Sequence, residues 1–220
     1  MKRFLMLTTF LVVAVAFCIS AKGDRIKGSG AVTTVVREFP TVRGIRLEGS
    51  TQVVITKGAV QQVGLKGYTN ILPYIETHME GPILVISTSK DARIQNDNTV
   101  VYLELADLEF VTVEGSGNVT VNGAFKTPNL VVSVLGSANV KLQKGAADNI
   151  GIEVSGSGNV EAYNFKARRA TVNVSGSGNV QLNASESLKA VISGSGNVYY
   201  KGAPPEVKPY VSGSGQVMAQ

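Results

Sequence analysis

Cysteine is almost absent from this chain, because Cys18 is the only one among 220 residues. It lies in an N-terminal segment that we expect to be removed, which would leave a mature chain without disulfides. A lipoprotein signal has a small residue before the modified cysteine, whereas Phe17 precedes this one. We therefore expect no lipid anchor, and the stability of the fold has to come from packing.

Histidine is equally scarce, so a Ser-His-Asp triad could be built only around His78. The Gly-x-Ser-x-Gly motif, which presents the nucleophile of many serine hydrolases, does not occur. From residue 101 onward the only aspartates are Asp107 and Asp148, and the glycine-rich bends lack the Asp of a calcium-binding repeat. We therefore predict that the protein is not an enzyme and needs no metal or other cofactor.

Basic residues do not gather in a stripe, although the formal charge is +5. The one local cluster is Lys166, Arg168 and Arg169, without the interleaved aromatics that are typical of a nucleic-acid interface. The Gly-Ser-Gly segments lack the third glycine of a dinucleotide fingerprint and the lysine of a P-loop. Neither a nucleic acid nor a nucleotide is expected as a partner.

Long apolar runs are confined to the N-terminus. Two basic residues precede an apolar run over residues 4–17, and the small residues Ser20 and Ala21 follow it. This is the pattern of a secretory signal peptide, and the run is short for a membrane span. We expect residues 1–21 to be cleaved. The mature chain, residues 22–220, would be exported to the periplasm, the outer-membrane surface or the medium, without an integral membrane segment.

What the sequence does contain is a pentapeptide, Gly-Ser-Gly-Asn-Val or a near copy, which occurs six times in its second half. The fourth residues of the copies lie 18 to 21 residues apart. They are Asn118, Asn139, Asn159, Asn179, Asn197 and Gln216. A fixed period of this length indicates a solenoid, in which each repeat buries its apolar face only by stacking on its neighbours.

Apolar residues flank each copy at every second position, as Val172 and Val174 do before Asn179 and Val180 and Leu182 do after it. That alternation is the period of a strand with one buried face. The Leu-x-x-Leu-x-Leu frame of a leucine-rich repeat is missing. We predict an all-β, single-stranded parallel β-helix (β-solenoid) with coils of about 20 residues and strands about 4.8 Å apart. The crossover rule favours right-handed coiling.

The same frame continues toward the N-terminus with less regularity. Leu47 and Val53 take the expected positions around Gln52, and the segment 28–32 (Gly-Ser-Gly-Ala-Val) fits one coil earlier. Between Gln52 and Asn118 there is room for three further coils, and strand-like segments occur at residues 62–65, 83–87 and 100–105.

We therefore predict one domain over residues 22–220. Its coils would be less regular over residues 22–110 and regular over residues 111–220. The last coil contains Pro204, Pro205 and Pro209. Because proline cannot donate to a sheet, residues 203–212 are expected to form a C-terminal cap; a proline-rich docking segment is the alternative.

The repeat itself has a structural explanation. A sharp corner usually needs a positive φ and leaves no space for a Cβ atom, which accounts for its glycines. Those directly before the Asn are Gly117, Gly158, Gly178 and Gly196. The asparagines, with Gln216 at the end, would stack as a ladder of side-chain amides. A ligand-binding role for the serine and asparagine rows is the alternative.

Two other surfaces could bind a ligand. The bends at 143–149, 164–169 and 183–187 differ in length and charge from coil to coil, and loops commonly carry specificity on a rigid scaffold. Tyr199 and Tyr210 occupy outward positions in the last coils, where an aromatic ring could stack on a sugar. Both tyrosines also have an ordinary structural explanation as strand residues. A glycan, or a surface protein of the envelope or of a host, is the expected partner.

Four features together resemble a known family. They are the opening segment 37–50 (Arg-Glu-Phe-Pro-Thr-Val-Arg-Gly-Ile-Arg-Leu-Glu-Gly-Ser), the segment 67–72 (Gly-Tyr-Thr-Asn-Ile-Leu), the Ser-Gly-Ser-Gly-Asn-Val coils and the closing segment 194–204. Over nearly the whole mature chain they are similar to the putative auto-transporter adhesin, head GIN domain proteins of Gram-negative bacteria. The resemblance implies an exported β-helix with an adhesin-like role at the envelope or surface, and it supplies no catalytic residues.

Our first hypothesis is a non-enzymatic binding module of the cell envelope or surface. The second is a polysaccharide lyase or hydrolase, since β-helices also host such enzymes. It is weakened because Glu114, Glu153, Glu161 and Glu186 fall in four different rows of the repeat, whereas glycan hydrolysis needs paired carboxylates. The third is a structural subunit of an envelope assembly.

Overall fold

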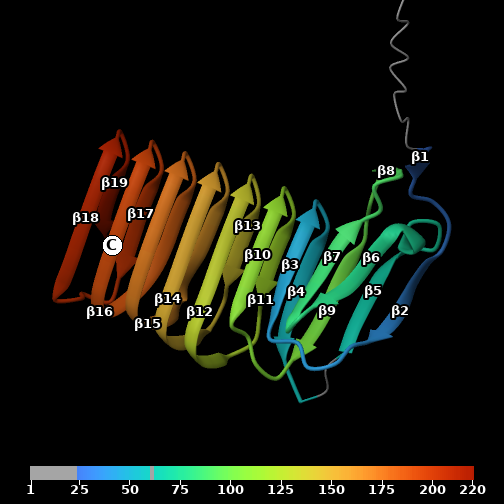
Figure 1. The fold of residues 1–220 in the computed structure, drawn as a ribbon, viewed down its shortest axis with the longest axis horizontal. Helices are drawn as coiled ribbons and strands as arrows, with labels where there is room; N and C mark the ends of the chain where they lie inside the picture. The colour runs from blue at the N-terminus through green and yellow to red at the C-terminus, as the bar shows by residue number, and fades with distance from the viewer. Residues whose placement is uncertain (1–23, 60–61) are drawn as a thin grey trace, which may run out of the picture.

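The computed structural model describes residues 24–59 and 62–220, so the predicted signal peptide over residues 1–21 lies outside the described residues. The described chain is nearly all β, with a short 3-10 helix, η1 (Leu72–Tyr74). Its strands stack side by side in successive coils and form a rod (Figure 1). The prediction of an all-β solenoid is confirmed.

The strands that lead into each corner stack in parallel and form what we call the first face. Their register matches the sequence frame, because Val111 lies opposite Ile45 on one side and Val132 on the other. In spatial order these strands are β3 (Gly44–Gly49), β10 (Phe110–Gly115), the second half of β12 (Phe125–Gly136), the second half of β14 (Gly145–Gly156), the ends of β15 (Asn159–Gly176) and β16 (Asn179–Gly194), and β18 (Glu206–Gly213).

The strands that follow each corner form the second face. They are β4 (Gln52–Lys57), β11 (Asn118–Val121), β13 (Asn139–Leu142), the starts of β15 and β16, β17 (Asn197–Lys201) and β19 (Gln216–Ala219). The segments that close each coil form a third face, made of residues 125–129, 145–149, 165–169 and 183–187. The third face corresponds to the bends that vary from coil to coil.

The order of the N-terminal coils differs from the expectation. Gln52 pairs directly with Asn118, so the prediction of three coils between them is wrong. The intervening chain instead stacks on the opposite side of the β3–β4 coil, where β7 (Ile83–Thr88) pairs with β3 and β9 (Val100–Leu105) pairs with β4. The number of residues between Gln52 and Asn118 is compatible with both the predicted and the observed order, because the length of a segment does not determine on which side of a coil it packs.

Antiparallel strands complete this end of the rod. β2 (Val32–Glu38) pairs with β5 (Gln62–Tyr68), so the segment 28–32 that leads into β2 is not a corner of the stack, and that prediction is wrong. The other antiparallel pairs are β5 with β9 and β6 (Ile75–Glu80) with β7. β1 (Asp24–Lys27) and β8 (Ala92–Gln95) form a separate parallel pair. The predicted strands at 62–65, 83–87 and 100–105 are confirmed as β5, β7 and β9.

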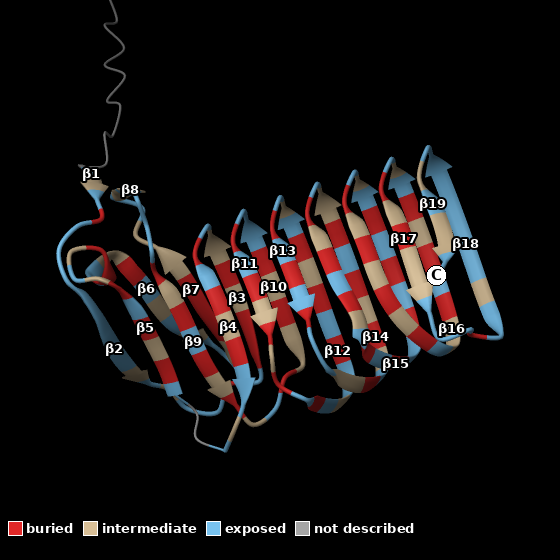
Figure 2. Cartoon of the chain, turned by 180° about the vertical axis from the view of Figure 1, so that it is seen from behind, coloured by how far each residue is buried: buried red, intermediate tan, exposed pale blue. Residues whose placement is uncertain are grey.

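The core is made of inward rows in which each apolar residue stacks on its counterpart in the next coil. Val113, Val134 and Val154 are all fully buried in one such row, and buried residues alternate with exposed ones along the strands (Figure 2). Burial of apolar surface contributes about 25 cal/mol per Å². Because the row continues from coil to coil, each coil depends on its two neighbours for that stabilisation.

The two ends of the rod are covered differently. Ile71, Leu72 and Ile75, around η1, are at most 4% exposed. In the last coil Val211 is 44% exposed, although Ile192 in the same row of the preceding coil is 1% exposed. β18 accordingly has mostly exposed residues at the end of the rod (Figure 2). The last described coil keeps the repeat pattern without a neighbour on its outer side.

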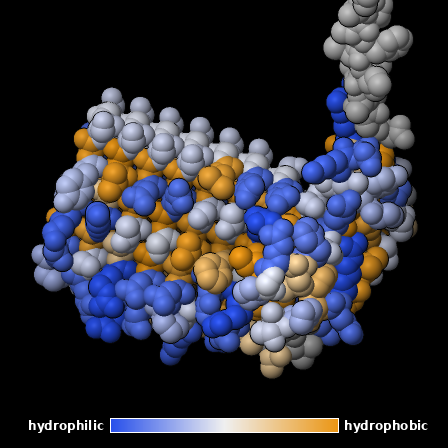
Figure 3. Space-filling model, viewed as in Figure 1, coloured by the Kyte–Doolittle hydropathy of each residue, from blue (hydrophilic) through white to orange (hydrophobic). Residues whose placement is uncertain are grey.

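The corner glycines have two different roles. The first glycine of the repeat has a positive φ, +123° at both Gly156 and Gly176, which favours glycine. The second glycine does not, but a Cβ atom at Gly158 would lie 2.4 Å from the carbonyl oxygen of Ala138. The predicted positive φ is therefore wrong for the second glycines, where the constraint is space. They are Gly117, Gly158, Gly178 and Gly196, all buried. Along this edge of the rod, pale atoms form a continuous row (Figure 3).

Candidate functional site

The asparagines of the repeat lie in one column where the corner meets the second face. Asn139 Nδ2 donates to Asn118 Oδ1 at 3.0 Å, and Asn159 Nδ2 donates to Asn139 Oδ1 at 3.0 Å. Beyond Asn159 the backbone amide also takes part, so that one Oδ1 accepts two hydrogen bonds. Asn179 N and Nδ2 donate to Asn159 Oδ1 at 3.1 and 3.2 Å. In the next coil Asn197 N and Nδ2 donate to Asn179 Oδ1 at 3.2 and 3.1 Å, and Gln216 N donates to Asn197 Oδ1 at 3.1 Å. The column holds these amides in fixed orientations.

A shallow trough of about 480 Å³ lies beside this column on the second face. It is lined by Asn139, Asn159, Val160, Glu161, Asn179, Gln181, Asn197 and Tyr199. Glu161 Oε2 accepts from Lys141 Nζ at 2.8 Å. Of the described residues that line the trough, Glu161 alone carries a carboxylate. The trough therefore presents mainly neutral amide groups and one tyrosine.

A second hollow of about 240 Å³ adjoins the trough and shares Glu161 and Gln181 with it. Tyr163 lines this hollow, and Lys201 Nζ lies 4.5 Å from the centroid of its ring. Burial raises the pKa of Tyr163, and the nearby Tyr199 raises it further. The Tyr163 hydroxyl therefore stays protonated at neutral pH and can donate a hydrogen bond.

The two tyrosines that the sequence singles out do not lie together. Tyr199 is in β17 on the second face, next to Gln181 of the preceding coil. Tyr210 is in β18 on the first face, opposite Val191, and is 57% exposed. Only Tyr199 contributes to the trough, and Tyr210 is exposed at the end of the rod.

Sequence reasoning missed Lys141 and Gln181 on this surface and considered Glu161 only as a possible catalytic carboxylate. Lys141, Glu161 and Gln181 fall in the same outward row as Tyr199, two residues after each Asn of the column. The signal was present in the repeat, because residues at one offset from the Asn share one row. Comparison of the outward offsets, rather than the inward ones alone, would have found it.

The single histidine is exposed, and possible metal ligands do not cluster in the described residues. His78 lies in β6, where its Nε2 is 3.4 Å from Glu80 Oε1 and its side chain is exposed. Within residues 24–59 and 62–220, no three His, Cys, Asp or Glu side chains are grouped so that they could hold a metal ion. Among the same residues, no helix has the length and hydropathy of a membrane span.

A family model described as putative auto-transporter adhesin, head GIN domain matches residues 42–204. The chain belongs to this family. The match runs from the start of the β3–β4 coil to the proline segment before β18, so the family match includes the whole trough. No curated protein is significantly similar to the chain.

Crystal structures of other bacterial proteins share this fold. A putative adhesin from Bacteroides fragilis is 22% identical with a TM-score of 0.73, over 89% of this chain and 100% of that chain. A putative adhesin from Parabacteroides distasonis is 20% identical with a TM-score of 0.62, over 90% of this chain and 100% of that chain. A putative lipid binding protein from the same species is 21% identical with a TM-score of 0.58, over the same shares. At these identities the likeness concerns the fold alone.

Proposed function

We propose that the protein is an exported, non-enzymatic binding module of the cell envelope or surface, adhesin-like, whose second-face trough binds a neutral glycan. The observation that carries this proposal is the fixed row of side-chain amides beside Tyr199. Membership of a family described as putative auto-transporter adhesin, head GIN domain supports the adhesin-like part of it.

The chemistry of the trough suits sugar hydroxyls. Each asparagine amide has two N–H donors, of which the column uses at most one, and the Gln181 amide has both donors and an acceptor, so sugar hydroxyls can find partners of both kinds. The Tyr199 ring can cover the apolar face of a sugar. Because the asparagines are already tied to one another between coils, binding costs little further side-chain ordering.

The same lining argues for binding rather than hydrolysis. Glycosidases place two carboxyl groups about 5–10 Å apart across the scissile bond. In the described trough Glu161 has no carboxylate partner, and its own carboxylate is held by Lys141 at 2.8 Å.

A structural subunit of an envelope assembly is the second candidate. It is favoured by the open end of the rod, where Tyr210 and Val211 are 57% and 44% exposed. Exposed apolar residues that gather in one place are a common feature of protein interfaces.

A glycan array with the purified protein, followed by titration calorimetry, tests the binding proposal. We expect at least one neutral oligosaccharide to bind, with an affinity about fivefold lower in Tyr199→Ala, since aromatic contacts of this kind contribute about 1 kcal/mol. Tyr102→Ala is the control, because it removes a tyrosine in β9 that is 44% exposed and does not line the trough, and it should leave the affinity unchanged. Absence of any neutral-glycan binding, or equal losses in the two variants, would refute the trough as a glycan site. Recovery of a stable envelope complex through the open end would instead favour the assembly subunit.

A further inference from the structure

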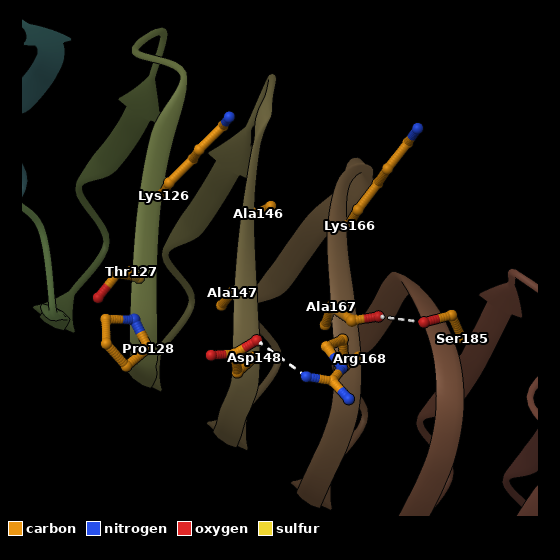
Figure 4. A pocket seen from close by; sticks show the side chains of 10 residues that line it. All are labelled: Lys126, Thr127, Pro128, Ala146, Ala147, Asp148, Lys166, Ala167, Arg168 and Ser185. Atoms are coloured by element: carbon orange, nitrogen blue, oxygen red, sulfur yellow. Dashed lines mark hydrogen bonds and ion pairs between the residues drawn. The ribbon is translucent and has the colours of Figure 1, made fainter.

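A separate groove, of about 450 Å³, crosses the third face over four successive coils. In Figure 4 the side chains of Lys126 and Lys166 stand at one side of it, with the short side chain of Ala146 between them. The strand register explains this arrangement, because Lys126 pairs with Ala146 and Ala146 pairs with Lys166. The two lysine-bearing strands are thus two strand spacings, about 10 Å, apart.

The acidic side chains of this face are already paired with arginines. Arg168 Nε donates to Glu186 Oε1 at 2.6 Å, and Arg168 also lies 3.6 Å from Asp148. Arg169 donates to the other oxygen of Glu186 at 3.1 Å. Hydrogen bonding to Glu186 raises the pKa of Arg168. These carboxylates are therefore engaged below the lysines and leave the lysine side of the groove without a counter-charge.

Lys126 and Lys166 themselves make no ion pair with any residue of the described chain. Both lysine side chains are exposed, and the residue between them in the row is the small, half-buried Ala146. Two ammonium groups on flexible stems can converge on one anionic group placed above that alanine. The charge of the groove is therefore complementary to an anion.

The floor of the groove is made of small apolar side chains. Ala147 and Ala167 are buried in its floor, and Pro128 lies at its edge. Such a floor can contact the C–H face of a saturated ring. No aromatic side chain lines the groove in the described structure, so it offers no stacking platform of the kind that single-stranded nucleic acids use.

We propose that this third-face groove binds an acidic polysaccharide, with a carboxylate or sulfate of one sugar held between Lys126 and Lys166 above Ala146. The site lies on a different face from the neutral amide trough and uses none of its residues. Its test therefore stands apart from the test of the proposed function.

The experiment measures binding of three oligosaccharides by calorimetry at low and physiological salt. These probes are an oligogalacturonate, its neutral methyl ester and a heparin oligosaccharide. We expect binding of one or both acidic probes, weakened by salt, and no binding of the ester that depends on Lys126 and Lys166. A carboxylate or a sulfate preference is given by which acidic probe binds more tightly. Failure of both acidic probes to bind would overturn the proposal.

Variants then locate the site. Lys126→Gln with Lys166→Gln should weaken acidic-probe binding at least tenfold. The matched control, Lys66→Gln with Lys189→Gln, removes the same charge from exposed positions on other strands and should change it less than twofold. Equal losses in the two double variants would mean non-specific attraction and overturn the site.

A substitution between the lysines tests geometry instead of net charge. Ala146→Glu places a carboxylate where the ligand anion is expected and should abolish binding, whereas Ala146→Gln, of similar size, should retain at least a third of the affinity. Equal effects of the two would contradict an anion position above Ala146. A single-stranded oligonucleotide that binds more tightly than either glycan, in a lysine-dependent way, would reassign the groove to nucleic acid.

Discussion

Asn159 shows how one side chain serves two neighbours in the column. Its Nδ2 donates to Asn139, and its Oδ1 accepts from both the backbone and the side chain of Asn179. Aspartate has nearly the same shape and keeps the acceptor, but its carboxylate cannot donate. The substitution therefore separates the donor from everything else that Asn159 contributes.

We predict that Asn159→Asp lowers the free energy of unfolding by about 1 kcal/mol at pH 7, which corresponds to a fall of about 2–4 °C in Tm. The loss should become smaller below about pH 4, where a protonated carboxyl can donate again. Thermal unfolding followed by circular dichroism measures both effects. Asn164→Asp, at an exposed position of the same coil, is the control and should change Tm by less than 1 °C, about the effect of an ordinary surface substitution. An unchanged Tm for Asn159→Asp would show that the column adds no stability.

The second glycine of the corner can be tested against a glycine that has space. A Cβ atom at Gly158 would lie 2.4 Å from a backbone oxygen and 2.4 Å from Val134 Cγ1, whereas at Gly151 it would meet nothing within 4 Å. We predict that Gly158→Ala destabilises by about 1–3 kcal/mol and that Gly151→Ala is neutral or stabilises by up to about 1 kcal/mol. Chemical denaturation compares the two. Similar values for both would mean that the coils can move apart at the corner without cost.

At the scale of single elements, the last first-face strand has a proline at an informative position. Val131 donates its backbone amide to Glu109 of the preceding coil, and amides alternate in direction along a strand. The amide of the next row, that of Val132, therefore faces the following coil. Pro209 occupies this row in β18, so the missing donor is on the open side of the rod.

We predict that Pro209→Val restores this donor and increases self-association, because an open strand edge pairs with other chains. Sedimentation velocity over a range of concentrations should show dimers or larger species that the parent protein lacks. Pro205→Ala, at an exposed position just before β18, is the control and should sediment as the parent does. If Pro209→Val sediments as the parent does, residues 203–212 do not cap the rod in this way.

The elements show where sequence reasoning succeeds and where it stops. The inward rows around Asn118 to Gln216 were predictable, because a regular period fixes both the register and the buried face. The placement of β7 and β9 was not, since both strands have the right local pattern and pairing partners are set by long-range packing. Tyr199 was found from its outward position, whereas the Lys126–Ala146–Lys166 row needed the register of the less regular third face.

At the scale of the whole molecule, the regular coils are interchangeable units. Each contacts only its neighbours, and the Asn column, the corner glycines and the apolar rows repeat from coil to coil. Removal of one complete coil should therefore rejoin equivalent surfaces. Removal of half a coil should not.

We predict that deletion of residues 179–196, which joins Gly178 to Asn197, gives a shorter protein that still unfolds cooperatively with strand-type circular dichroism. Deletion of residues 179–188 brings the corner of one coil against the middle of another and should give an unfolded or aggregated chain. Circular dichroism and limited proteolysis distinguish the two. Equal failure of both deletions would mean that the coils are not independent units.

The out-of-order stacking of β7 and β9 has a consequence for the time course of folding. During synthesis, which starts at the N-terminus, β3 and β4 are made early. Their partners on one side, β7 and β9, are complete only at Leu105, and those on the other side, β10 and β11, only at Val121. Every later coil finds its preceding partner already in place as it emerges. The first 105 residues therefore have to be synthesised before the N-terminal coils can stack, and from then on the rod can grow by one coil for every 20 or so residues.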